Sequence, residues 1–405
     1  MSVQHGDYAS DTLPLSIAPK QFGVDGVQEE RDWPLMTRDE LSGVLARYRR
    51  DANHSRTDAE IGPIATVSWH SPRPFSAAAI VNTVRGDVLF VKRHHVTIRD
   101  TEGLHEEHRF IAHLRSRGMP VSDVLDTFDG ATAVTSGDWT YEVHALAPGV
   151  DAYRETMSWL PFSHASHAYA AGRTLARMHR AAADYAAPAR TIRPLLQSFR
   201  VLGSDDFSGA LERWVDAQPL MLEALGSRAW RSEIVDAIGP HHARFAPCLP
   251  SLEPLWTHGD WHASNLLWTD VAAGAQVRTI LDFGLSDRTC AVYDLALAIE
   301  RNAIEWMSAA ENRRVHFYQI DALLTGYESL NPLSGEAYFA LIALLPIVHT
   351  EFALSEVGYF AGIVKSPENA DVAYDGYLLG HARWFETSAG RAVLDWLRKR
   401  DRSRR

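Results

Sequence analysis

The feature that most constrains the fold is a single change of pattern, at the turn Pro148-Gly149. Before this turn, residues 61–91 hold short runs rich in Val, Ile, Thr and Phe, separated by Pro and Gly, which predicts antiparallel strands. After the turn, apolar residues recur mostly at helical spacing. Because 405 residues exceed one ordinary compact core, we expect an α+β fold with two lobes: a small antiparallel β lobe first and a larger, mainly helical lobe second.

Other elements follow from the same patterns. A helix is expected over 104–117, since Gly118 and Pro120 would stop it. In the first 58 residues, Leu41, Val44, Leu45 and Tyr48 predict one short capped helix. Further strands are expected within 124–134 and over 141–145, 266–268 and 277–283. We therefore predict an N-terminal extension at 1–58, an N-terminal lobe at 59–145 and a C-terminal lobe at 146–405.

Composition excludes several functional classes. Forty Lys and Arg against 51 Asp and Glu leave a formal charge of -11, which disfavours nucleic acid as a partner. Cys248 and Cys290 lack the spacing of a disulfide framework or a CxxC motif. No secretory leader is visible at the N-terminus, and the most apolar stretch, 338–354, contains Pro346, His349 and Glu351, which suits a buried helix better than a membrane span. We expect a cytoplasmic protein without a membrane partner.

The densest chemical motif is HGDWHASN, residues 258–265, in which Asp260 and Asn265 stand five positions apart. This is the spacing of the kinase catalytic loop, where the Asp accepts a hydroxyl proton and the Asn holds magnesium. Seventeen residues further on, ILDFG places Asp282 at the end of an expected strand. A hairpin between the two motifs would bring Asp282 beside Asn265, and two oxygen ligands suit Mg²⁺.

A second pair of residues supports the same chemistry. Lys92 ends the apolar strand DVLFVK, and Glu107 lies on or beside the apolar face of the helix that follows. A carboxylate placed there needs a buried partner, so we predict an ion pair between Lys92 and Glu107 on the nucleotide phosphates. Glu106 is the rival for this role, although its direction is more solvent-facing.

Two other interpretations of HGDWH stay open at this point. His258, Asp260 and His262 form an H-x-D-x-H pattern that could ligate zinc in a hydrolase. That interpretation gives no role to ILDFG or to Lys92. Alternatively, Asp260 only caps a turn and Asn265 only begins a strand.

Together these motifs resemble the aminoglycoside phosphotransferase and choline kinase family, a branch of the protein-kinase-like fold. The resemblance covers about 64–301 and includes EEHRFIAHL, GRTLARMH and YDLALAIE. It implies ATP and Mg²⁺ as cofactors, Lys92 on the phosphates with Glu107 holding it, Asp260 as base, and Asn265 and Asp282 on the metal. Backbone groups near Val143 and Ala145 would bind adenine, and Asp294 would brace the catalytic loop, unless it is a helix N-cap. The departure is the turn HSPRPFSAA, which lacks the glycines that cover phosphates in protein kinases.

The acceptor is the least defined part of this prediction. HGDxHxxN is more typical of kinases of small molecules than of protein kinases, so we expect a small hydroxyl compound such as an aminoglycoside, an amino alcohol or a sugar. A protein or lipopolysaccharide acceptor is an alternative, as is a catalytically silent kinase-like binding module. Acidic and aromatic walls would suit a cationic amine. The candidates for these walls are Glu300, Glu305, Trp306, Glu351 and Glu356.

Overall fold

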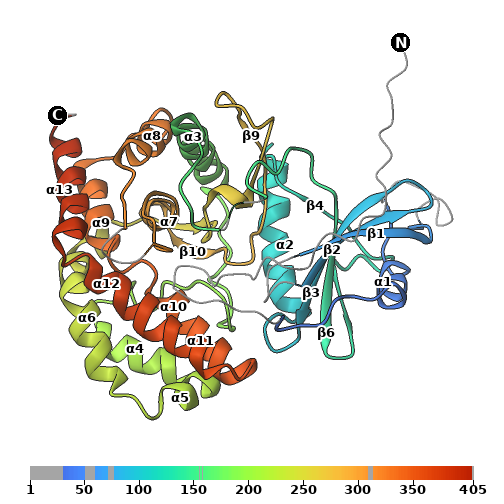
Figure 1. Ribbon diagram of the computed structural model, residues 1–405, viewed down its shortest axis with the longest axis horizontal. Coiled ribbons are helices and arrows are strands. Elements are labelled where there is room, and N and C mark those ends of the chain that lie inside the picture. The colour runs from blue at the N-terminus through green and yellow to red at the C-terminus, as the bar shows by residue number, and fades with distance from the viewer. Residues whose placement is uncertain are drawn as a thin grey trace.

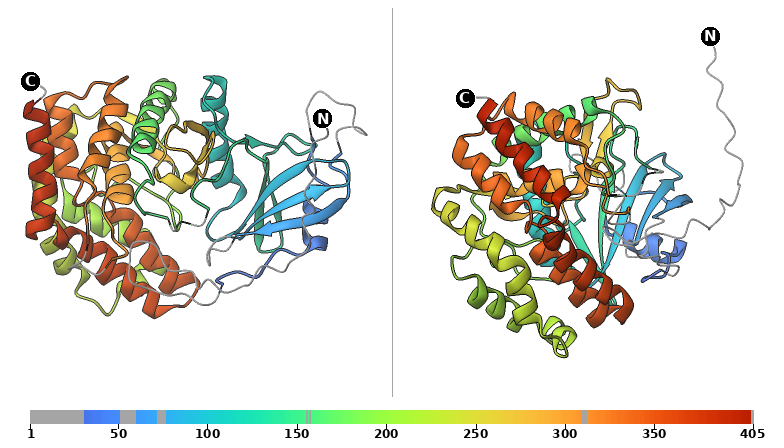
Figure 2. Two further views of the ribbon diagram at one scale, coloured as in Figure 1. Left: turned by 45° about the horizontal axis from the view of Figure 1, so that its top comes forward. Right: turned by 60° about the vertical axis from the view of Figure 1, so that its left-hand side comes forward.

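The computed structural model describes residues 31–50, 60–71, 77–154, 156, 158–308 and 313–403. A sheet with two flanking helices forms one lobe, and a larger assembly of helices forms the other (Figures 1 and 2). The α+β class, with a small antiparallel lobe before a helical lobe, is therefore confirmed. Most of the turn HSPRPFSAA lies outside the described residues, as do 1–30 of the N-terminal extension.

The sheet of the first lobe is antiparallel throughout. Its order is β1-β2-β3-β6-β4, and β5 also pairs with β6. The register places Lys92 of β3 opposite Ala78 on one side and opposite Glu142 on the other. The strands are β1 (Ile64–His70), β2 (Ala77–Thr83), β3 (Val88–His95), β4 (Asp123–Val124), β5 (Ala133–Ser136) and β6 (Trp139–Ala145).

Helix α2 (Thr101–Ser116) stands between this sheet and the helical lobe (Figure 1). It begins where the side chain of Asp100 accepts a hydrogen bond from the Gly103 amide at 2.7 Å, an N-cap that satisfies one free donor of the first turn. Its buried face includes Glu107 and His108 among apolar residues. The start of α2 lies three residues earlier than the sequence pattern predicts, because Asp100 is the cap.

The predicted short helix near the N-terminus is α1 (Arg38–Leu45), which begins with a capping box of Thr37 and Glu40. Its apolar side chains join the core of the sheet lobe, and the Tyr48 hydroxyl donates to the Tyr141 carbonyl at 2.9 Å. This part of the predicted extension therefore packs as an element of the first lobe.

The second lobe is built around α7, in which every residue from 292 to 303 is buried. Helices α3 and α8 pack closely, because a side chain at Gly172 or Gly326 would meet the backbone of the opposite helix. No helix among the described residues is long and apolar enough to cross a membrane. The helices are α3 (Ala165–Ala182), α4 (Phe207–Asp216), α5 (Pro219–Leu225), α6 (Trp230–Phe245), α7 (Ala291–Ala303), α8 (Phe317–Glu328), α9 (Gly335–Leu344), α10 (Thr350–Val357), α11 (Pro367–Asp371), α12 (Gly380–Trp384) and α13 (Ser388–Ser403), with π-helical segments η4 (Gly358–Ile363) and η5 (Val372–Leu379) and the 3-10 segment η1 (Ala246–Ser251).

Two small antiparallel pairs hold the catalytic motifs in this lobe. Strand β8 (Leu266–Trp268) pairs with β9 (Val277–Ile280), and this is the predicted hairpin between Asn265 and Asp282. Strand β7 (Pro254–Thr257) pairs with β10 (Asp287–Cys290), which the sequence pattern did not predict. Strand β9 ends before the predicted position 283, because Asp282 takes a left-handed conformation (φ 58°) that breaks the extended backbone.

Candidate active site

The loop that carries Asp260 runs from β7 to the short helix η2 (Ala263–Asn265). Gly259 has φ 75°, and a side chain there would collide with the carbonyl of Leu285, so the turn requires glycine. The amides of His258 and Gly259 each donate to the carboxylate of Asp294 at 2.8 Å. Asp294 therefore braces the loop. Its alternative role as N-cap is wrong, because Cys290 occupies the N-cap of α7.

Three groups surround the Asp260 carboxylate. The Asn265 Nδ2 group donates to its Oδ2 at 2.9 Å, while the guanidinium of buried Arg301 contacts Oδ1. His262 Nε2 lies 3.4 Å from the same oxygen. Since donors hold both carboxylate oxygens, the orientation of Asp260 is set by residues outside its own loop as well as within it.

The imidazole of His258 is held by two backbone groups, and its Nδ1 accepts a hydrogen bond from the Asp260 amide at 3.1 Å. Its Nε2 forms a hydrogen bond with the Leu281 carbonyl at 2.8 Å, and burial lowers the pKa of this histidine. A neutral imidazole that donates to a carbonyl ties the catalytic loop to the segment before Asp282. Since backbone groups occupy both ring nitrogens of His258, the geometry does not support the zinc interpretation of the H-x-D-x-H pattern, which needs one of these nitrogens for the metal.

Asn265 and Asp282 lie at the same cavity, and their donor atoms fit a hard divalent cation. The Nδ2 group of Asn265 is occupied by the carbonyl and the carboxylate of Asp260, at 3.0 and 2.9 Å, which leaves the amide oxygen of Asn265 facing away from Asp260. Leu281 N donates to the Asn265 carbonyl at 2.9 Å and so aligns the two segments. One amide oxygen and one carboxylate are ligands of the type that Mg²⁺ takes.

The predicted partner of Lys92 needs a correction. Lys92 Nζ lies 2.9 Å from Asp282 Oδ1, whereas the carboxylate of Glu107 lies 3.9 Å from the guanidinium of Arg190. Burial disfavours the charge of Lys92, but the carboxylates of Asp282, Glu142 and Glu107 outweigh it and raise the lysine pKa. Glu107 therefore acts on Lys92 through space, and Asp282 is its contact partner.

The rival residue Glu106 is also held by arginine. Its carboxylate lies 2.8 Å from Arg193 and 3.7 Å from Arg190. The helical spacing in α2 correctly predicted that Glu107 is more buried than Glu106. It could not predict that Arg190 and Arg193 contact these glutamates, because the two arginines lie more than 80 residues later in the chain.

The backbone at Val143 and Ala145, the predicted adenine contacts, takes part in pairing within the sheet. The Val143 carbonyl accepts from the Leu125 amide at 2.8 Å, and Ala145 pairs with Asp123 in the sheet. Ala145 nevertheless lines a cavity together with Leu146, Ala147 and Gly149, where the chain leaves the sheet, so adenine binding at this segment stays a prediction.

Two cavities meet at the junction of the lobes. The first, the hinge cavity, is lined by Phe90, Leu146 and Ala147 as well as by Asn265. The second, the Asp260 cavity, is lined by Asp260 and His262 and by several aromatic side chains. Both cavities share a wall formed by Lys92, Glu107 and Asp282. A group placed at this shared wall is within reach of both cavities.

Of the five predicted wall residues, Glu356 lines the Asp260 cavity. It is buried, its Oε2 has no hydrogen-bond partner among the described residues, and burial raises its pKa to about 8. The other four have partners elsewhere: Glu351 accepts from the Arg200 and Val201 amides, Glu305 pairs with His316, Glu300 with His381, and Trp306 donates to the Glu300 carbonyl.

The sequence motifs did not predict that Arg301 contacts Asp260, although its position relative to Asp294 indicates that it can reach the catalytic loop. Arg301 lies seven residues after Asp294, so the two side chains share one face of α7 and both reach the catalytic loop. Trp33 and Trp159 also line the Asp260 cavity. Neither has a local signal, since each comes from irregular chain far from the motif.

A sheet lobe and a helical lobe, with a lysine, an Asp-Asn loop and a second aspartate at their junction, define a kinase-like phosphotransferase. The chain belongs to the phosphotransferase enzyme family, whose model matches residues 75–333. The resemblance seen in the sequence and the expectation of a phosphotransferase enzyme are thus confirmed.

Three individual proteins are similar to this chain. A homoserine kinase from Rhodospirillum rubrum is 27% identical over 235 residues, which cover 58% of this chain and 62% of the relative. The crystal structure of an aminoglycoside phosphotransferase from Alicyclobacillus acidocaldarius matches 92% of this chain and 98% of its own, with 19% identity and a TM-score of 0.50. An amicoumacin kinase in complex with AMP-PNP and Ca²⁺ has 15% identity, a TM-score of 0.49, and coverage of 83% and 91%. The match to the aminoglycoside phosphotransferase structure supports the kinase-like fold.

Proposed function

We propose that this protein transfers the γ-phosphoryl group of ATP to a hydroxyl group of a small molecule. The observation that carries the proposal is the shared wall of the two cavities. Lys92 and Asp282 belong to both, while Asn265 faces the hinge cavity and Asp260 faces the other. A nucleotide in the hinge cavity would present its phosphates at the wall, on the side opposite to a hydroxyl beside Asp260.

Each residue then has a defined task. Lys92 neutralises phosphate charge, and the backbone of 146–149 contacts the base. Asn265 and Asp282 hold Mg²⁺, which supplies charge neutralisation for the phosphates when bound. Asp260 orients the acceptor hydroxyl in line with the phosphorus and takes its proton. Arg301 and Asn265 keep the Asp260 carboxylate in place. Phosphoryl transfer requires mainly placement and charge, which these few residues provide.

The acceptor lies in the Asp260 cavity. Its lining combines Asp260 and Glu356 with aromatic rings of Trp33, Trp159 and Tyr359. A compound with a hydroxyl near Asp260 and an amine near Glu356 would match this lining through a hydrogen bond to the Glu356 carboxyl group and cation-π contacts with the rings. The homoserine kinase relative acts, by its name, on homoserine, a small amino acid that carries a hydroxyl group, which supports a hydroxyl acceptor of this size.

The test is a screen for acceptor-dependent ADP release. The purified protein is incubated with Mg-ATP and a panel of homoserine, other amino alcohols, aminoglycosides, sugars and intact proteins, with the Asp260→Asn variant as the background. We expect one class of small hydroxyl compounds to raise ADP release above that of the variant. Phosphorylation of proteins alone would contradict the proposed acceptor class, and ATP binding without transfer to any class would contradict catalysis.

A further inference from the structure

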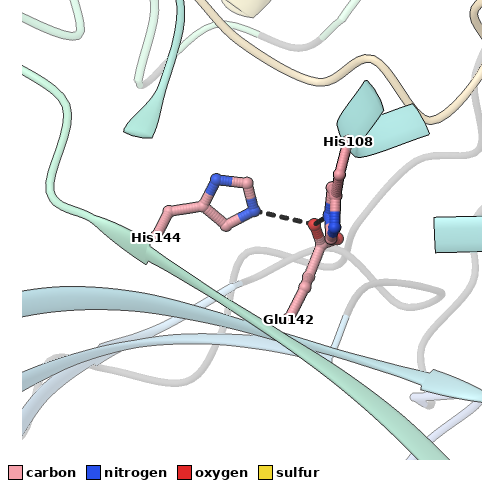
Figure 3. A group of neighbouring side chains, drawn as sticks. All are labelled: His108, Glu142 and His144. Carbon is pink, nitrogen blue, oxygen red and sulfur yellow. Dashed lines mark hydrogen bonds and ion pairs between the residues drawn. The ribbon is translucent and has the colours of Figure 1, made fainter. Parts of the chain in front are cut away.

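A cluster of histidines surrounds one carboxylate within the sheet lobe. His144 lines the hinge cavity and Glu142 lines the Asp260 cavity, but the phosphoryl transfer proposed above gives neither of them a task. Figure 3 shows its centre, where His108 of α2 and His144 of β6 both point at Glu142 of β6. The Nε2 atoms of His108 and His144 lie 2.8 and 2.7 Å from the same oxygen, Glu142 Oε2. The three residues are only 3%, 7% and 1% exposed. Two imidazoles and a carboxylate thus converge on one point of the core.

A metal ion is the ligand that such a set of atoms suits. One atom of each side chain lies within 4.8 Å of the others, which places two nitrogens and one oxygen around a common centre. Zinc binds imidazole nitrogen and carboxylate oxygen at about 2.0 to 2.2 Å, with tetrahedral ligand atoms about 3.4 Å apart. Opening the two contacts by roughly 0.6 to 0.7 Å would therefore admit the ion.

Partners behind the three side chains support a metal-binding arrangement. The Nδ1 atom of His108 lies 2.8 Å from the Thr132 hydroxyl, and His94 Nε2 lies 2.9 Å from the other oxygen of Glu142. A hydroxyl on the far nitrogen fixes the ring and can hold the tautomer with its lone pair on Nε2, as outer partners of metal-bound histidines do. His94 orients the carboxylate in the same way.

We propose that His108, Glu142 and His144 form a site for a transition-metal ion of the zinc class. The site differs from the magnesium site proposed above in its chemistry, because two nitrogens favour a borderline-soft ion over Mg²⁺. The carboxylate of Glu142 also attracts Lys92 through space, while the ammonium of Lys92 contacts Asp282. Since His108 comes from α2 and the other two ligands from β6, a bound ion fastens the helix that carries Glu107 to the sheet strand opposite Lys92.

The experiment measures metal binding without nucleotide or acceptor, so its result does not depend on the proposed kinase activity. Untagged full-length protein is stripped with EDTA, loaded with Zn²⁺, freed of excess by gel filtration, and assayed for zinc by mass spectrometry. Loading with Co²⁺ gives a visible absorption spectrum that reports the ligand geometry. We expect one equivalent of zinc per chain, a cobalt spectrum typical of four-coordinate nitrogen and oxygen ligands, and a higher melting temperature with zinc than without.

Variants assign the site. His108→Ala and His144→Ala should each lose the retained equivalent, whereas His105→Ala, a half-buried histidine one turn earlier on α2, should keep it. Variants are compared only if they melt cooperatively, and the zinc-dependent melting shift of the unaltered protein provides a measurement that needs no variant. If the unaltered protein retains no zinc and its melting temperature does not change with zinc, the proposal is wrong. The cluster would then be a set of structural hydrogen bonds to Glu142. Retention that survives loss of both His108 and His144 would overturn it too.

Discussion

Lys92 Nζ and Asp282 Oδ1 lie 2.9 Å apart, although 190 residues separate them in the chain. Lys92 comes from the third strand of the sheet lobe, while Asp282 follows the hairpin of the helical lobe. This ion pair joins the lobes at the wall that both cavities share. The residue proposed to bind phosphate and the residue proposed to bind the metal are thus held together directly.

A double-mutant cycle distinguishes this contact from the pair that the sequence predicted. Lys92→Met is combined with Asp282→Asn or with Glu107→Gln, and the free energy of unfolding is measured in urea. The coupling of Lys92 to Asp282 should be about 0.5 to 1 kcal/mol, because the pair is partly exposed, and the coupling to Glu107 should be smaller. A larger coupling to Glu107 would show that Lys92 changes partner in solution.

Replacement of the proposed base tests catalysis. Asp260→Asn preserves the shape of the side chain but removes the proton acceptor, so transfer should fall by about 100-fold to 10,000-fold while Mg-ATP binding is retained. Steady-state turnover and calorimetric titration with Mg-ATP measure the two effects separately. The exposed Asp216→Asn is the matched control and should leave both unchanged. Near-normal turnover of Asp260→Asn would remove Asp260 from the role of base.

How much of this site the sequence predicts depends on how local each contact is. Asp260 and Asn265 lie in one loop and Asp282 follows a short hairpin, so spacing alone indicates that they approach. The partner of Lys92 depends on how the two lobes pack, and the pattern of α2 carries no information on that packing. The pairing of the Val143 carbonyl could not be predicted for a similar reason, since the two-residue strand β4 before its donor Leu125 is too short to leave a periodic signal.

The segment before α1 should influence the acceptor and not the nucleotide. Trp33 lines the Asp260 cavity, and the neighbouring Asp32 accepts a hydrogen bond from the Tyr359 hydroxyl of the helical lobe at 2.6 Å. Loss of an aromatic wall costs about 1 to 1.5 kcal/mol, so Trp33→Ala should raise the KM for the acceptor roughly tenfold and leave the KM for ATP nearly unchanged. Trp33→Phe, which keeps a ring, should recover most of the affinity. Equal changes in both KM values would mean that Trp33 only supports the arrangement of the lobes.

The buried carboxyl group of Glu300 should make the protein less stable as the pH rises from 4.5 to about 8. Burial, together with repulsion from Glu356, raises the pKa of Glu300 from 4.5 to about 8 in the folded protein. Its proton is therefore held more tightly in the folded state, and stability from this group is present below pH 4.5 and is lost as the pH rises through about 8.

A neutral isostere removes this dependence. Between pH 6 and pH 9, the free energy of unfolding of the unaltered protein should fall more than that of Glu300→Gln, because glutamine carries no proton to lose. Urea unfolding at several pH values measures both slopes, and the exposed Glu253→Gln serves as the matched control that should keep the slope of the unaltered protein. His381 Nδ1 lies 2.8 Å from Glu300, and the guanidinium of Arg301 lies 3.9 Å away. If these two groups keep Glu300 ionised in the folded protein, the free energy of unfolding will change with pH by the same slope in all three proteins. That outcome would show that Glu300 is charged at neutral pH and that the interior around Arg301 is more polar than its burial indicates.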